Sequence, residues 1–176
     1  MIIIVGFFPG ENSPHPIAYG SLRSCYSRPE AVKPYFQRFM DTLPDIAALA
    51  EAPEETLLKL WEGLGYYNRV RNLQKAAIQI MEDYAGIMPD SYEELLKLKG
   101  IGSYTAGAVS SIAYGKPNPA VDGNVLRVIA RIRKDDRCIS EDKVKKAVEK
   151  DLWEVIPKDR PGDFNQAMME IGACVC

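Results

Sequence analysis

The chain has 176 residues, of which 47% are hydrophobic and 26% are charged, the balance of an ordinary globular protein. This length suits one or two small domains that bury a hydrophobic core. The formal net charge of −2 gives no overall signature of nucleic-acid binding, so any such contact has to come from a local basic patch.

The apolar start, residues 1–8, is shorter than a secretory signal core or a membrane span, so we expect a cytoplasmic protein without a membrane anchor. Residues 9–29 are rich in Pro, Ser and Gly without a sustained period and predict an irregular arm. From Glu30 onward, helical spacing of apolar residues dominates. Helices are predicted before Pro44, from Pro53 to Gly63, Tyr66 to Tyr84, Ser91 to Lys99, Ser103 to Ala113, Asn124 to Arg133, a Ser140 cap to Val155, and from Pro161 onward.

The longest predicted helix, Tyr66 to Tyr84, is amphipathic, and Gly86 and Pro89 stop it. Its inward side is expected to carry Leu73, Ala76, Ala77, Ile80 and Met81. Beyond the short apolar start, no stretch alternates convincingly with period two. The predicted fold class is therefore all-α.

Two glycines, Gly100 and Gly102, flank one apolar residue and precede helix-forming residues from Ser103. Glycine lets another surface approach the backbone closely, and the free N–H groups of the following helix attract anions such as phosphate. Before the turn, Ser91 and Glu94 have the spacing of a capping box. A helix, hairpin and helix over residues 91–113 are typical of a module that grips a nucleic-acid backbone, although a plain helix–helix connection is the alternative.

Asp122 follows the apolar run Pro119-Ala120-Val121 and precedes Gly123 and a helix that begins near Asn124. A carboxylate at this place can simply cap the helix. It comes about twenty residues after the hairpin, so one compact unit can hold both a phosphate grip and a buried acid.

Three local basic clusters are candidates for contact with nucleic acid, and each is also compatible with a solvated helix face. They comprise Arg69, Arg71 and Lys75; Lys97 and Lys99; and Arg127, Arg131, Arg133 and Lys134. The four cysteines are too few for a disulfide scaffold, and one histidine, His15, argues against zinc or histidine chemistry.

Several motifs together carry a family resemblance. Residues 98–107, with Gly100 and Gly102, and residues 119–128, with Asp122, resemble the helix-hairpin-helix DNA glycosylases. Residues 61–73, which read Trp-Glu-Gly-Leu-Gly-Tyr-Tyr-Asn-Arg-Val-Arg-Asn-Leu, and residues 164–173, which begin Phe-Asn-Gln-Ala-Met and end Gly-Ala, resemble the adenine DNA glycosylase (MutY) branch. The match extends from about residue 30 to Cys176 with the motifs in the same order.

The resemblance implies an all-α helix-hairpin-helix DNA glycosylase fold. Residues 30–134 are expected to form a six-helix barrel module with the hairpin at 91–113. Residues 135–176 are expected to form the C-terminal helices of a partial iron–sulfur module. Residues 1–29 fall outside both.

Cleaving the bond between base and sugar passes through an oxocarbenium-like state, and the base must first be flipped out of the duplex. The resemblance gives Asp122 the role of stabilising the cationic sugar, together with a part in forming a transient covalent intermediate. It places Leu64 and Tyr66 in the base stack beside the lesion and Gln166 against the flipped adenine. The remaining residues that it implies at the DNA are Lys99, Gly100, Gly102, Tyr104 and Asn124. Core packing is the alternative for each stacking or base-contacting residue, more so for Leu64 than for Tyr66.

Tyr104 lies at the hairpin position where bifunctional relatives such as endonuclease III carry a lysine. A phenol cannot form a Schiff base, so the resemblance implies a monofunctional glycosylase. The implied substrate is double-stranded DNA with adenine opposite 8-oxoguanine or guanine, and a monomer associated with the bacterial nucleoid is expected. Two alternatives stay open: another enzyme of the superfamily, endonuclease III-like or thymine-mismatch-specific, and a non-catalytic DNA-binding fragment.

The family's glutamate that protonates adenine has no counterpart here, because neither Glu11 nor Glu30 lies in a matching motif. Read two bases later, the codons of Phe7–Pro29 can encode the family's Pro-Trp-Arg and Ser-Glu-Ile-Met-Leu-Gln-Gln-Thr runs. Our hypothesis is that this segment is translated in a shifted frame, which would leave the chain with poor turnover. Codons incompatible with the second reading would refute it.

The family binds a 4Fe–4S cluster through four cysteines, the first of which matches Cys176. The pair Cys174-x-Cys176 is not a metal site by itself, and one thiolate cannot hold a cluster that needs four. We therefore expect the polypeptide as given to be colourless after anaerobic reconstitution. A broad visible absorption band with stoichiometric iron would contradict this expectation.

Overall fold

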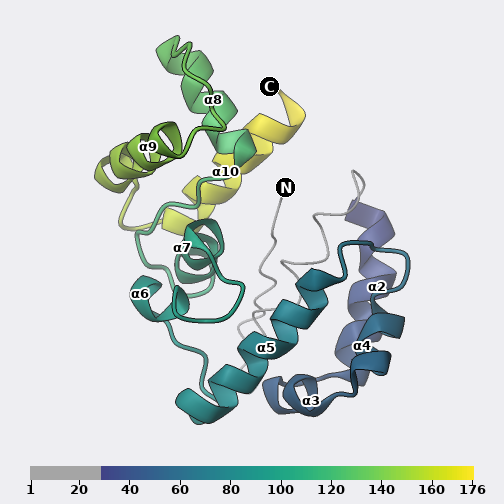
Figure 1. Ribbon diagram of the computed structural model, residues 1–176. Coiled ribbons are helices and arrows are strands. Elements are labelled where there is room, and N and C mark those ends of the chain that lie inside the picture. Colours follow the sequence, from purple (N-terminus) through teal and green to yellow (C-terminus); the bar gives the residue numbers. More distant parts are fainter. Residues whose placement is uncertain (1–28) are drawn as a thin grey trace. The chain divides into compact units, whose positions relative to one another are not determined.

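A computed structural model describes residues 29–176 of the chain (Figure 1). All regular secondary structure in this part is α-helical, which confirms the predicted fold class. The helices are α2 (Pro29–Thr42), α3 (Ile46–Glu51), α4 (Glu54–Leu60), α5 (Asn68–Asp83), α6 (Tyr92–Leu95), α7 (Ser103–Ile112), α8 (Gly123–Arg133), α9 (Asp142–Val155) and α10 (Pro161–Cys174). None of these helices is long and apolar enough to cross a membrane. The shifted-frame hypothesis, with His15 and Glu11, concerns residues outside the described part.

The chain divides into two compact units, one that ends at Ile101 and one that comprises Gly102–Cys176. The division falls inside the glycine turn rather than at residue 134, where the family resemblance divides the sequence. The division at residue 134 stays a prediction.

In the first unit, α5 is the central helix, because α3 and α4 pack against it and α2 packs against α4. Trp61 is fully buried and meets the edge of the Phe39 ring at a centroid distance of 6.2 Å. Most of the predicted inward side of α5 is buried, but Met81 is 39% exposed, so its predicted burial is wrong. Met81 follows Ile80 directly and lies at the edge of the apolar stripe, where the helical period turns it toward solvent.

Several predicted helix boundaries differ from the structure: α4 ends at Leu60 rather than Gly63, and α6 ends at Leu95 rather than Lys99. The short helix α3 was not predicted separately; the Asp45 side chain caps it by accepting a 2.7 Å hydrogen bond from the Ala48 amide. Helix α5 begins at Asn68 rather than Tyr66, because Tyr66 has a left-handed φ of 49° that no α-helix accommodates. Ser140 does not cap α9, since Glu141 occupies the N-cap position there without a side-chain hydrogen bond.

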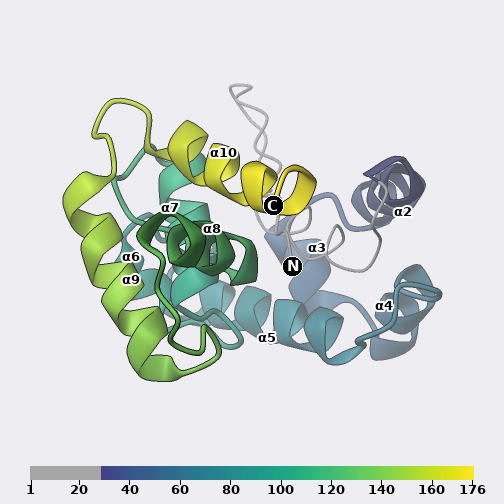
Figure 2. The same ribbon diagram turned by 90° about the horizontal axis from the view of Figure 1, so that it is seen from above.

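In the second unit, α10 packs against both α7 and α8, and α9 packs against α8 (Figure 2). The apolar faces of α8, α9 and α10 meet in one core. Its buried members are Val125, Leu126, Ile129, Val148, Leu152 and Met169. Helix α10 thus touches both the helix that leaves the glycine turn and the helix that Asp122 begins.

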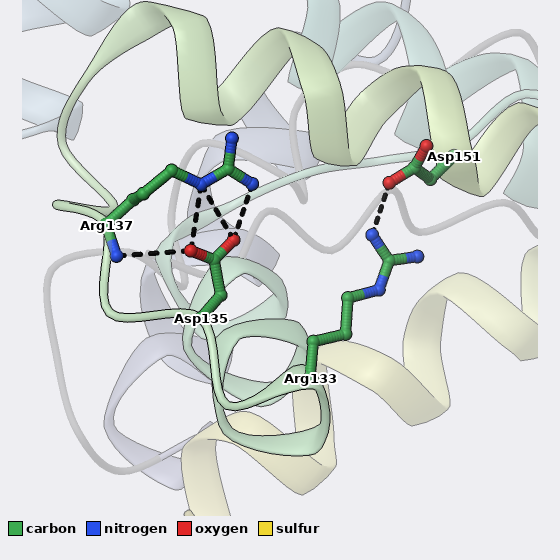
Figure 3. Close-up of polar contacts among 4 residues, drawn as sticks. All are labelled: Arg133, Asp135, Arg137 and Asp151. Atoms are coloured by element: carbon green, nitrogen blue, oxygen red, sulfur yellow. Dashed lines mark hydrogen bonds and ion pairs between the residues drawn. The ribbon is translucent and has the colours of Figure 1, made fainter.

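Helix α8 ends in a Schellman-type turn in which Lys134 adopts a left-handed φ of 52° and the Asp135 amide bonds the Ala130 carbonyl at 2.9 Å. Arg137 then folds back onto Asp135: its Nη2 lies 2.6 Å from Oδ2 and its amide also donates to the carboxylate (Figure 3). These hydrogen bonds lower the pKa of Asp135 from 3.8 to about 2. In the same view Arg133 pairs with Asp151 and so links the end of α8 to α9.

We predict that Asp135→Asn destabilises the fold at neutral pH and that this effect becomes smaller in acid. Because the folded-state pKa lies below the unfolded value, the carboxylate stabilises the fold above about pH 4 and loses this effect as the pH falls toward 2. Urea unfolding at pH 7, 4 and 2.5 measures the difference. Asp136→Asn removes the same charge one residue away and serves as the control. A pH-independent difference between Asp135→Asn and the unsubstituted chain would refute the prediction.

Candidate functional site

The first half of the glycine turn is fixed to α5. Gln79 accepts a 3.1 Å hydrogen bond from the Lys99 amide and donates one of 3.2 Å to the Lys97 carbonyl. Gly100 has a φ of 77°, and a Cβ there would lie 2.7 Å from the Cβ of Asn72. Glycine is therefore required at position 100 both by the backbone conformation and by close packing on α5.

The second glycine of the turn, Gly102, faces open space. It is the N-cap of α7 with an extended φ of −101°, and a Cβ there would meet nothing within 4 Å. No side chain caps this helix, so the amides of its first turn remain available to an anion. Nothing within the described fold requires glycine at this position.

The helix before the turn, α6, begins at a half-formed capping box. Ser91 Oγ accepts from the Glu94 amide at 3.2 Å, but the Glu94 carboxylate does not return to Ser91. It pairs instead with Lys97 Nζ at 2.5 Å and accepts from the Tyr84 hydroxyl at 2.7 Å. These hydrogen bonds lower the pKa of Glu94, whereas the bond to Glu94 raises the pKa of both Lys97 and Tyr84.

The predicted basic clusters have different surroundings in the structure. Several members have partners within their own unit: Arg71 with Glu54, Lys97 with Glu94, Arg133 with Asp151, and Arg131 with the Cys176 carbonyl. Lys75 and Lys99 are exposed and line one shallow pocket together with Asn72, Gln79 and Gly100; Glu82 and Asp83 lie in the same pocket. Lys75 and Lys99 are therefore the members of these clusters best placed to meet a phosphate near the hairpin.

Asp122 is buried, with 5% of its surface exposed, and forms the N-cap of α8. Its Oδ1 accepts from the Val125 amide at 2.8 Å, and its Oδ2 accepts from Asn124 Nδ2 at 3.0 Å. These two contacts orient the carboxylate group. The structure confirms the capping role considered from the sequence, and the carboxylate that caps α8 is buried.

Asn124 links this carboxylate to α10. Its Oδ1 accepts from Arg127 Nη2 at 2.8 Å, and the same guanidinium donates to the Gly172 carbonyl. A Cβ at Gly172 would lie 2.5 Å from the Cβ of Asn124, so only glycine lets α10 approach this closely. The contacts of Asn124 in this structure are with Asp122, Arg127 and Gly172.

The segment that leads into Asp122, residues 118–122, is also held by α10, through Asn165. Its Oδ1 accepts from the Ala120 amide at 3.0 Å, and its Nδ2 donates to the Asn118 carbonyl at 2.9 Å and to Ser111 Oγ at 2.8 Å. The same segment lies directly on α7, since a Cβ at Gly107 would be 2.0 Å from the Pro119 carbonyl oxygen. This segment, which we call the Asp122 bend, is thereby tied to the helix that leaves the glycine turn.

The sequence patterns assigned no role of their own to Asn165 and Gly107, and they did not predict the contacts of Arg127. Asn165 stands out in the sequence only as part of a family motif, and Arg127 only as a member of a basic cluster. A signal for Asn165 was available, because it lies at an inward position of α10, four residues before the core residue Met169. A polar side chain at such a place has to find partners, and the backbone of an irregular segment is the usual source.

The loop that carries Leu64 and Tyr66 has three residues with left-handed backbone angles. These are Gly63, Gly65 and Tyr66, with φ values of 89°, 68° and 49°. The Trp61 indole donates to the Gly65 carbonyl at 2.9 Å and so fixes the loop to the core. A non-glycine residue in this region costs about 1–3 kcal/mol, and such strain is concentrated at functional sites.

The two residues expected in the DNA stack are placed differently. Tyr66 is 74% exposed, and Arg69 lies over its ring with a Cζ to centroid distance of 5.0 Å. Leu64 is only 3% exposed and occupies a core position, so it would have to leave the core to enter DNA. The exposure fits an inserting role for Tyr66, whereas the position of Leu64 matches the packing alternative.

Tyr104 and Gln166 lie in the second unit. Tyr104 packs against the core of that unit, and its hydroxyl lies 3.2 Å from Met169 Sδ. Gln166 is exposed on α10, with a long 3.5 Å hydrogen bond from Nε2 to the Gly162 carbonyl. Its amide is thus accessible to an external group, while Tyr104 has a packing role in this structure.

The iron–sulfur ligand set is not complete within the described residues. Cys138, Cys174 and Cys176 are exposed free thiols, and residues 29–176 contain no group of three or more His, Cys, Asp or Glu side chains suited to a metal ion. A 4Fe–4S cluster needs four thiolates, which this part of the chain does not bring together.

Comparison with known families supplies the deciding observation. Residues 27–158 match the model of the HhH-GPD superfamily base excision DNA repair proteins. The chain belongs to this superfamily. The resemblance predicted from the glycine turn and the Asp122 motif is confirmed.

Curated relatives within the superfamily are adenine DNA glycosylases. The chain is 45% identical to the Mus musculus adenine DNA glycosylase over 147 residues, which cover 81% of this chain and 28% of the mouse protein. It is 40% identical to the Schizosaccharomyces pombe adenine DNA glycosylase over 152 residues, which cover 85% of this chain and 33% of the yeast protein. The chain thus spans about a third of these relatives.

Solved structures of the superfamily share the fold. A non-covalent endonuclease III–DNA complex aligns with a TM-score of 0.69 and 32% identity over 81% of this chain and 65% of that chain. A thermostable thymine-DNA glycosylase aligns with a TM-score of 0.72 and 26% identity over 81% of this chain and 66% of that chain. These alignments confirm the predicted glycosylase fold.

We predict that Gly107→Ala destabilises the chain by about 3 kcal/mol, the upper end of the cost of overpacking. The new Cβ would be placed 2.0 Å from the Pro119 carbonyl oxygen, and backbone cannot move away cheaply. Gly123→Ala is the matched control, because a Cβ there meets nothing within 4 Å. We expect it to be neutral or to stabilise by up to about 1 kcal/mol. Urea unfolding measures both, and equal stability of the two variants would contradict the packing described.

Proposed function

We propose that this chain is the core of a monofunctional DNA glycosylase that hydrolyses the N-glycosidic bond of adenine opposite 8-oxoguanine or guanine. The observation that carries the proposal is the buried carboxylate of Asp122, oriented at the start of α8 and tied to the helix that leaves the glycine turn. The adenine DNA glycosylases among the relatives support the choice of base.

In the proposed reaction, Asp122 stabilises positive charge on the sugar as the bond to adenine breaks. Opposite charges about 4 Å apart attract by about 4 kcal/mol at an effective dielectric constant of about 20, and burial keeps the interaction from being screened further. The Val125 amide and the Asn124 side chain hold the carboxylate in one orientation before the substrate arrives. No reorganisation of this group is then needed at the moment of reaction.

The proposed DNA contacts come from both units. In the first unit, Lys99 and the neighbouring Lys75 meet backbone phosphates, and the exposed Tyr66 enters the base stack. In the second unit, Gly102 and the first amides of α7 bind a phosphate, and Gln166 contacts the flipped adenine. Lysine and helix-end contacts hold the backbone without reading sequence, as a repair enzyme requires.

A hydrolytic rather than strand-cleaving reaction follows from Tyr104. Its phenol cannot form the Schiff base that a lysine forms, and its hydroxyl lies at Met169 within the core. The acid that protonates adenine has no candidate in a matching motif of this sequence. We therefore propose slow turnover for the chain as given, with restored activity when residues 7–29 are translated in the second frame.

Adenine release under single-turnover conditions from a duplex with adenine opposite 8-oxoguanine tests the proposal. We expect measurable release by the frame-restored chain, slower release by the chain as given, and a loss of at least about 100-fold in Asp122→Asn with the Kd for DNA nearly unchanged. Gly102→Ala is expected to weaken DNA binding about tenfold without changing the unfolding midpoint, because its Cβ meets no atom of the protein.

Other outcomes distinguish the alternatives. Release of thymine or of oxidised pyrimidines, but not adenine, would assign the chain to another branch of the superfamily. Duplex binding without release of any base, even by the frame-restored chain, would make it a non-catalytic DNA-binding module. Release by Asp122→Asn at the unsubstituted rate would remove Asp122 from the reaction.

A further inference from the structure

We infer that Asn165 is a positioning residue for Asp122: it fixes, from helix α10, the backbone segment that presents this carboxylate. The inference rests on the proposed function for its catalytic consequence. Its structural content, that the placement of Asp122 depends on the Asn165 amide, stands on the contacts alone.

Both polar atoms of the Asn165 amide bond the backbone of the Asp122 bend. The side chain, which is 2% exposed, accepts from the Ala120 N–H and donates to the Asn118 carbonyl, so it replaces the partners that a neighbouring strand would supply. An amide carries its acceptor and its donors on two separate atoms, so it can bond two backbone groups at once in a way that a single hydroxyl cannot. Ala120 is two residues before Asp122, which leaves little freedom between the held backbone and the carboxylate.

The segment is held from a second side by a polar network on α7. Ser111 Oγ accepts from Asn165 at 2.8 Å, and Ser110 Oγ accepts from Asn118 Nδ2 at 2.8 Å while it donates to the Ala106 carbonyl at 2.6 Å. These groups are all buried. A fully bonded buried network specifies one arrangement, because any shift leaves polar groups unsatisfied.

Helix α10 holds the chain on both sides of Asp122. Before Asp122, the Asn165 side chain bonds the backbone of the chain. After Asp122, Asn124 packs closely on Gly172 and Arg127 donates to the Gly172 carbonyl. The two positions are seven residues apart, which is about two helical turns, or roughly 10 Å, along one face. A single rigid helix therefore sets the position of the bend from both ends, and Asn165 is its attachment on the upstream side.

Substitution of Asn165 by leucine tests the inference, since leucine keeps the number and branching of the side-chain heavy atoms and removes all three hydrogen bonds. Asn165→Asp keeps an acceptor for Ala120 but loses both donated bonds, and it serves as the second variant. Val148→Ala is the control, because it truncates an α9 side chain in the core of the same unit and removes none of the hydrogen bonds of Asn165. The full chain is used throughout, and urea unfolding records the stability of each variant.

Two readouts report the placement of Asp122 without relying on activity. One is the pH titration of the Asp122 carboxyl carbon in chain labelled with 13C aspartate. The other is hydrogen exchange of the Val125 amide, which bonds Asp122 Oδ1 at 2.8 Å. We expect Asn165→Leu to change the titration and to speed Val125 exchange at least tenfold relative to Val148→Ala, with Asn165→Asp intermediate.

In the frame-restored chain, the same variant is expected to lower the single-turnover rate of adenine release at least tenfold, with the Kd for DNA changed less than threefold. Asp122 titration and Val125 exchange in Asn165→Leu that match the Val148→Ala control would overturn the inference. If Asn165→Leu does not fold, the comparison is made with Asn165→Asp, and control-like values there overturn the inference as well. Absence of adenine release by the frame-restored chain without other substitutions, with a clear Asn165 effect on both readouts, would refute the proposed function alone.

Discussion

The arrangement of the second unit depends on the attachment of the chain to α10 on both sides of Asp122. An irregular segment has no repeating hydrogen bonds of its own, so its buried polar groups have to be satisfied by neighbours. Asn165 supplies these partners before Asp122. After Asp122, the contact of Arg127 with the Gly172 carbonyl joins the start of α8 to α10. A carboxylate that acts on charge in the transition state needs this fixed position, because an error of about 1 Å costs much of the effect.

The glycines fall into two groups with different physical reasons. Gly107 and Gly172 are required by the fold, because a Cβ at either would lie within 3.0 Å of neighbouring backbone. Gly100 is required by its left-handed φ as well as by the contact with Asn72. At Gly102 a Cβ would have no atom of the protein within 4 Å, so the fold gives no reason for glycine. A partner that approaches the backbone from outside supplies one, and phosphate at the start of α7 fits that place.

Sequence patterns predicted what is decided locally. The all-α class, most helices and the capping role of Asp122 follow from apolar periodicity and from a carboxylate just before a helix. The family resemblance was also readable from short motifs. The start of α5 was not predicted because the left-handed φ of Tyr66 depends on the hydrogen bond from the Trp61 indole to Gly65 and on the glycines that precede Tyr66. Helix propensity does not represent such contacts.

Long-range partners were not predictable from the sequence. Asn165 and Ala120 are 45 residues apart, and Arg127 and Gly172 are also 45 residues apart. No local period indicates which backbone groups a buried amide will meet. The exposure of the two candidate stacking residues was not predictable either. Leu64 and Tyr66 are close neighbours in sequence, yet Leu64 is buried in the core and Tyr66 is exposed to solvent.

The central claim is that the fixed Asp122 carboxylate acts on positive charge at the sugar. Competition binding measures this directly with two duplexes that differ in one group: a protonated pyrrolidine nucleotide, or its neutral tetrahydrofuran counterpart, in place of the target adenosine. The account predicts that the chain binds the cationic duplex at least about tenfold more tightly and that Asp122→Asn abolishes this preference. Equal affinity for the two duplexes, or a preference that persists in Asp122→Asn, would contradict it.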